Sequence, residues 1–222
     1  RFLKDELDRY LRGRANESKF EKTLLDNDNQ AYVWYQKGAL ILYALQDLIG
    51  EKNLNKAFER YIDSAAFRPK APFTTSLEWY HFIKSATPDS LQYYLEDSFE
   101  KITLYSNKTS NATYKELDNG KYEVTIDVQS SKSHFDGNGK LLDSPESANL
   151  IEIGIFTEDA KNALGMTVKS PLVLEKRWVM PGENSFTYTV EKLPLKAGID
   201  PYNKMIDRIP DDNLIAVEEQ SD

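Results

Sequence analysis

Cysteine is absent from the 222-residue chain. This absence excludes a disulfide scaffold, a thiolate zinc site and a cysteine nucleophile. Histidine occurs only twice, as His81 and His134, in unrelated local contexts, so a histidine-based metal cluster would need both residues and added carboxylates. The longest apolar run, Ala39 to Leu45, is far shorter than the roughly 20 residues of a membrane span.

Positive charge is also scarce relative to negative charge. The chain has 28 lysine and arginine residues against 36 aspartate and glutamate residues, a formal net charge of -8. No cluster of basic residues forms a stripe, so nucleic acid is not an expected partner.

The chain does contain enough apolar surface for a folded protein. Hydrophobic residues make up 40 % of the sequence, which excludes wholesale disorder and allows one large domain or two small ones. The first residue is Arg1 rather than methionine, and no signal peptide precedes it. We therefore expect the chain to be a piece of a longer protein, and a piece can lack part of an active site.

Residues 1–100 have the period of α-helices. Apolar residues recur three and four positions apart in five stretches. These stretches run over Leu3–Leu11, Tyr35–Ile49, Leu54–Ala65, Leu77–Ile83 and Leu91–Phe99. A polar loop is expected between the first two, over residues 16–30. The pattern predicts an all-helical segment.

Short signals mark where these helices should begin and end. Gly13 and Gly50 are expected to stop the first and second helices. Thr75 begins a capping-box pattern with Glu78. Thr87, followed by proline, is expected to cap the N-terminus of the fifth helix.

After residue 100 the period of apolar residues changes to two. Tyr122 to Val128 alternate with polar residues, and Asn119-Gly120 before them is a strong hairpin signal. Residues 151–155 alternate in the same way, and Pro181-Gly182 is expected to turn the chain into a further strand. About seven short strands fit the pattern, which predicts an antiparallel β-sandwich over residues 101–222 with a turn-rich tail. The expected fold class is therefore α+β multidomain, with a helical segment over residues 1–100.

The most informative stretch is Tyr32 to Leu40, where the polar loop enters the most apolar helix. Aromatic residues at such a position are usually packing groups, and Tyr32 and Trp34 fit either a cleft or the core. Gly38 is harder to explain, because glycine inside a helix costs roughly 1 kcal/mol relative to alanine. We expect a neighbour to approach the backbone closely there.

Tyr35-Gln36-Lys37-Gly38 resembles the Tyr-x-Lys-Gly segment of zinc aminopeptidases of the gluzincin class, a family that includes alanyl aminopeptidases and leukotriene A hydrolase. Further segments resemble the family in the same order, so the resemblance covers nearly the whole chain. They are Arg1–Arg14, Thr74–Leu77, Thr87–Leu91, Phe99–Tyr105 and Ala197–Asn213. The last of these resembles the end of a bacterial subgroup, in which the peptidase is often fused behind membrane-embedded permease-like segments.

The resemblance implies that residues 1–100 form the C-terminal part of a thermolysin-like catalytic domain in a metallo-aminopeptidase. In this family a His-Glu-x-x-His helix and a later glutamate bind zinc, and a Gly-x-Met-Glu-Asn segment holds the peptide's amino terminus. None of these segments occurs here. The resemblance therefore implies zinc in the parent protein but none bound by this fragment, which is expected to be inactive alone.

One catalytic residue carries over from the resemblance, Tyr35, as the donor that stabilises the oxyanion. The implied partners are a peptide substrate and the upstream zinc-binding half of the same chain. Membrane-embedded segments upstream would make the parent a membrane-associated bacterial protein. The alternative is a non-catalytic peptide-binding or scaffolding module derived from the same fold.

Other polar residues are interpreted without a catalytic role. Lys37 is expected to shape the turn, and His81 to be a packed or surface histidine. His134 precedes Asp136 to Lys140, a run that resembles a calcium loop in part but fits a hairpin tip better. In the tail, Asp207, Asp211 and Asp212 are expected to be solvated turn residues.

Overall fold

The computed structural model describes residues 2–158, 160–161, 167–168 and 170–220. Arg1, at the start of the first segment that resembles the aminopeptidases, lies outside them. The fold is mixed, with helices in the first 100 residues and predominantly antiparallel sheets after them. The α+β class is therefore confirmed at this level.

Two compact units make up the chain. The first, here called the helical unit, contains residues 1–104, 134–143 and 204–206. The second, the strand unit, contains residues 105–133, 144–203 and 207–222. The helical unit thus includes one segment, 134–143, that comes from the middle of the strand-forming sequence.

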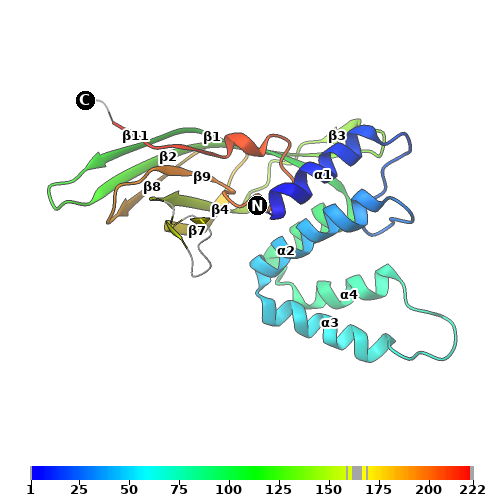
Figure 1. Ribbon diagram of the computed structural model, residues 1–222. Coiled ribbons are helices and arrows are strands. Elements are labelled where there is room, and N and C mark those ends of the chain that lie inside the picture. The colour runs from blue at the N-terminus through cyan, green and yellow to red at the C-terminus, as the bar shows by residue number, and fades with distance from the viewer. Residues whose placement is uncertain (1, 159, 162–166, 169, 221–222) are drawn as a thin grey trace. The chain divides into compact units, whose positions relative to one another are not determined.

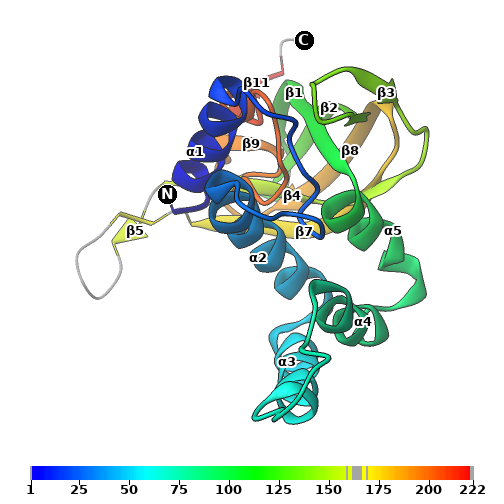
Figure 2. The same ribbon diagram turned by 90° about the vertical axis from the view of Figure 1, so that its right-hand side faces the viewer.

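Eight helical elements follow one another in the described part of the helical unit. They are α1 (Phe2–Asn16), the π-helix η1 (Tyr32–Lys37), α2 (Gly38–Ile49), α3 (Glu51–Ala65), α4 (Ser76–Ala86), the 3-10 turn η2 (Asp89–Leu91), α5 (Gln92–Leu95) and the π-helix η3 (Glu96–Glu100). The helices α3 and α4 lie side by side (Figure 1, Figure 2).

Two of the predicted helix boundaries are confirmed. Gly50 ends α2 with a φ of 86°, a conformation that glycine adopts without strain. The Thr75 side chain caps α4 by accepting a hydrogen bond from the Glu78 N–H at 3.3 Å.

Two other predicted boundaries are wrong. The first helix does not stop at Gly13 but continues to Asn16. Thr87 does not cap the N-terminus of the next helix, because its hydroxyl donates a hydrogen bond back to the Ile83 carbonyl at 2.9 Å. Thr87 therefore ends α4 instead of starting η2.

Most strands fall into two sheets. The element bounds are β1 (Ile102–Glu116), β2 (Tyr122–Phe135), β3 (Leu141–Asp143), β4 (Asn149–Phe156), β5 (Ala160–Lys161), β6 (Thr167–Val168), β7 (Pro171–Val179), β8 (Gly182–Val190), β9 (Lys196–Ile199), β10 (Leu214–Ala216) and β11 (Glu218–Glu219). One sheet has the order β11-β1-β2-β3 with β8 also paired to β2, and the other has the order β10-β9-β4-β7. The short strands β5 and β6 pair with each other.

The strand β2 is central to the first sheet. It is joined to β1 by the predicted turn, in which Gly120 has a φ of 75° and the Leu117 N–H donates to the Lys121 carbonyl at 2.8 Å. Its partner β8 runs antiparallel over nine residue pairs, from Tyr122 to Ser130 on β2. Figure 1 shows β1 and β2 as two long neighbouring strands.

The buried face of β2 changes its chemistry along the strand. Alternate residues are buried throughout, but they are aliphatic only as far as Val128. The next three buried residues are Ser130, Lys132 and His134. This polar continuation leads to the candidate site.

The tail contains one residue that the sequence analysis interpreted wrongly. Asp207 is not a solvated turn residue, since its side chain is fully buried. Its carboxylate accepts hydrogen bonds from the Asn107 and Ile209 N–H groups, both at 3.0 Å, and burial raises its pKa. Asp211 is exposed, as expected, whereas Asp212 is half-buried and its Oδ1 is buried.

Candidate functional site

Tyr35, the one catalytic residue predicted from the sequence, lies on the π-helix η1. Its side chain is 65 % exposed, and the exposed ring of Trp34 lies 5.2 Å from it between centroids. Val33 and Lys37, on either side of this pair, are fully buried. π-Helical turns inside longer helices occur frequently at functional sites, because they re-aim side chains that a regular helix would space evenly.

The base of η1 is packed against α1. The ring of Tyr32 lies 5.9 Å from that of Tyr10, and the backbone of Gly13 lies directly beneath Tyr32. Burial is the main cause that raises the pKa of the Tyr32 phenol. Of the two aromatic residues whose role the sequence left open, Tyr32 is thus a packing residue and Trp34 is exposed.

Lys37 anchors the other end of η1 in the core. Its ammonium lies 3.4 Å from the Lys101 carbonyl oxygen and 5.9 Å from the centre of the Tyr10 ring. Desolvation lowers the pKa of Lys37 to about 8, although nearby Glu21 opposes the shift. These contacts agree with a role in shaping the turn.

Gly38 follows Lys37, and the sequence-based explanation for it is wrong. A Cβ built on Gly38 would lie 3.7 Å from the Leu24 side chain, which is an ordinary van der Waals distance. The helix therefore has room for alanine at this position, and no neighbour among the described residues requires the glycine.

Glu21 lies beneath α1 and is 3 % exposed. Tyr10 donates a hydrogen bond to one carboxylate oxygen at 2.7 Å, and Arg14 forms an ion pair with the other. The Glu21 N–H also donates to the Gly137 carbonyl at 2.8 Å. This residue therefore joins α1 to the hairpin of β2 and β3.

The tip of that hairpin is Asp136 to Lys140, as predicted. The Asp136 carboxylate accepts hydrogen bonds from the N–H groups of Asn138 and Lys140 at 2.9 and 2.8 Å. The turn closes through Gly139, which has a φ of 80°. The carboxylate therefore organises the turn.

His134 is the residue that the sequence analysis missed. Its Nε2 lies 2.9 Å from an oxygen of Asp97 on η3, and its Nδ1 lies 2.6 Å from an oxygen of Asp143 on β3. The Nε2 contact with Asp97 is a hydrogen bond and the Nδ1 contact with Asp143 is within ion-pair distance, so the ring lies between two carboxylates. The period-two pattern of β2, extended through Ser130 and Lys132, was the available signal that His134 faces inward.

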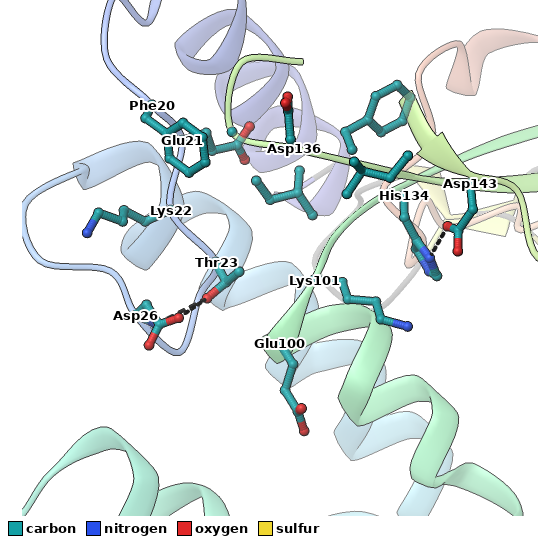
Figure 3. A pocket seen from close by; sticks show the side chains of 14 residues that line it. Phe20, Glu21, Lys22, Thr23, Asp26, Glu100, Lys101, His134, Asp136 and Asp143 are labelled. Atoms are coloured by element: carbon teal, nitrogen blue, oxygen red, sulfur yellow. Dashed lines mark hydrogen bonds and ion pairs between the residues drawn. The ribbon is translucent and has the colours of Figure 1, made fainter. Parts of the chain in front are cut away.

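A cavity of about 390 Å³ opens beside His134 in the helical unit. It is formed by the loop 20–26, by residues 100–102 where β1 begins, and by the hairpin 134–143. Figure 3 shows the charged ends of Lys22, Glu100 and Asp136 directed away from its centre.

Comparison with known proteins does not identify the chain, since no family model matches it and no curated protein is similar to it. Among the described residues, no group of three or more histidine, cysteine, aspartate or glutamate side chains has the arrangement of a metal site. No helix in the described ranges has the length and apolar character that crossing a bilayer requires.

Proposed function

We propose that this chain is the C-terminal part of a zinc metallo-aminopeptidase, which removes N-terminal residues from peptides. In this proposal the helical residues 1–100 complete a thermolysin-like catalytic domain, and residues 101–222 form a β-sandwich. The observation that carries the proposal is the exposed phenol of Tyr35, held on a π-helical turn between two fully buried residues. An exposed donor on a turn that is anchored by buried residues is suited to meet a substrate.

The chemistry assigned to Tyr35 follows from its side chain. When water attacks a peptide carbonyl, the carbonyl oxygen becomes an oxyanion, which a neutral phenol can stabilise by donating a hydrogen bond. Tyr35 also lies near the start of a helical segment that continues through α2. The free N–H groups at a helix start favour negative charge nearby.

The described residues do not fit a zinc ion, so the proposal requires the ligands elsewhere. Zinc bound by an upstream half of the protein would activate the water. This chain contributes the Tyr35 phenol. The π-helix η1 orients the phenol, and Tyr32 and Lys37 support η1.

The proposal is tested first by the coding sequence upstream of Arg1. It must encode a His-Glu-x-x-His helix and a later glutamate. If these ligands are absent or replaced, the chain is a peptide-binding or scaffolding module on an inherited fold.

The second test is Tyr35→Phe in the longer protein, with cleavage of an aminoacyl substrate as the readout. We expect kcat to fall roughly 10²–10³-fold, the loss typical of one oxyanion donor, with KM little changed. Tyr43 on α2 is also exposed, so Tyr43→Phe is the matched control and should leave kcat unchanged. Equal kcat values for the two variants would contradict the role of Tyr35.

A further inference from the structure

We propose that the cavity beside His134 binds a small, uncharged apolar molecule. This inference does not depend on the aminopeptidase proposal, because every residue that forms the cavity belongs to the helical unit described above. Tyr35 is not among the residues that line it.

Part of the cavity wall is apolar. Phe20, Ile102, Phe135 and Leu142 contribute the apolar side chains. The Phe20 ring packs on the backbone of Gly137, where any side chain larger than hydrogen would collide with it. Ile102 is 3 % exposed, whereas Phe20 and Leu142 are 54 % and 63 % exposed, so they form the open side.

The basic groups around the cavity are already paired with groups of the same chain. The Lys101 ammonium lies 2.6 Å from a Glu96 oxygen, and Lys22 lies 3.9 Å from Asp28. His134 is held between Asp97 and Asp143, as described above. A ligand anion would therefore have to compete with existing ion pairs.

The carboxylates around the cavity also have partners within the same chain. Glu100 accepts a hydrogen bond from the Tyr80 hydroxyl at 2.6 Å, and Asp26 is 3.2 Å from the Thr23 hydroxyl. Five carboxylates and three basic side chains line the cavity, so its potential disfavours anions further. An uncharged ligand neither competes with the existing ion pairs nor is repelled by the carboxylates.

The volume indicates the size of the ligand. A cavity of about 150 Å³ lined by leucine, isoleucine and phenylalanine side chains is enough to hold benzene. The cavity here, at about 390 Å³, has room for a substituted ring or a branched aliphatic group.

Toluene and benzoate test the proposal, because they share one ring and differ in charge. Each is titrated into the 222-residue chain while the methyl NMR signals of Ile102, Leu142 and Leu77 are followed. Leu77, on α4 and 54 % exposed, is the reporter outside the cavity. We expect toluene to shift the Ile102 and Leu142 signals to saturation and to leave Leu77 unchanged. Benzoate should bind about threefold or more weakly, given the excess of carboxylates.

Two variants locate the binding. Phe20→Ala removes one wall and should raise the dissociation constant of toluene severalfold. Phe73→Ala, an exposed phenylalanine outside the cavity, is the matched control and should leave it unchanged. Since both side chains are more than half exposed, neither substitution should unfold the chain. Toluene shifts that do not saturate, or that include Leu77, would overturn the proposal. An unchanged dissociation constant of toluene in Phe20→Ala would also overturn it, as would equal affinity for benzoate.

Discussion

Gly13 and Tyr32 touch so closely that a Cβ built on Gly13 would come within 2.5 Å of the Tyr32 Cβ. The glycine is therefore a contact residue and not a helix stop. It lets the base of η1 lie directly on α1, and through η1 it fixes the turn that carries Tyr35.

The first prediction concerns this contact. Gly13→Ala should lower the free energy of unfolding by about 1–3 kcal/mol, because overpacking outweighs the gain in helix propensity. Gly38→Ala is the matched control. Its Cβ has ordinary contact distances, so this variant should be neutral or more stable by up to about 1 kcal/mol. Urea unfolding measures the free energy of unfolding of both variants. Equal changes in the two variants would contradict the close contact between Gly13 and Tyr32.

The second prediction concerns His134. His134→Leu takes a hydrogen-bond partner from the carboxylate of Asp97, whose side chain is only 5 % exposed, so we expect a loss of about 1–3 kcal/mol in the free energy of unfolding. His81→Leu, at an exposed position, should change stability by less than about 0.5 kcal/mol.

A double-mutant cycle separates the ion pair from general packing loss. If His134 and Asp97 interact as described, His134→Leu combined with Asp97→Leu should lose less stability than the two single variants added together. Additive losses would show that the two side chains are energetically independent.

The third prediction is a pH dependence caused by Lys37. Its pKa of about 8 lies below the ordinary value of 10.5, so between these values the unfolded chain binds more protons than the folded chain. Stability should therefore rise with pH at the lower end of this window, by about 1 kcal/mol between pH 8 and pH 9. Measurements stop at pH 9, because the tyrosines of the unfolded chain ionise around pH 10, and those whose pKa is raised in the folded chain lower its stability there.

Lys37→Met is the control for this prediction. Methionine has a similar length and no charge, so the rise in stability between pH 8 and pH 9 should disappear. The same rise in both proteins would assign it to another group.

Local features of the fold were predictable because their causes are local. Gly120 and Gly50 adopt positive φ angles that the sequence marks with glycine, and the Thr75 cap involves a group three residues away. The prediction for Thr87 was wrong for a local reason too, because its hydroxyl had two kinds of backbone partner within reach. Its hydroxyl bonds the carbonyl four residues back instead of the N–H groups ahead.

The polar interior was not predictable, because its partners are remote in the sequence. His134 pairs with Asp97 across 37 positions, and Asp207 accepts from the N–H of Asn107 across 100. A composition pattern gives no sign of such pairs. Only the regular alternation of β2 indicated the orientation of His134, and it could not name the carboxylates that meet it.

The segment 134–143 has a consequence for how the chain can be divided. It belongs to the helical unit, yet the sequence on both sides of it belongs to the strand unit. A truncation after residue 104 would remove His134 from Asp97 and the Gly137 carbonyl from Glu21. The helical unit is therefore discontinuous in the gene, and expressing it alone requires a designed connection that restores the hairpin, not a stop codon.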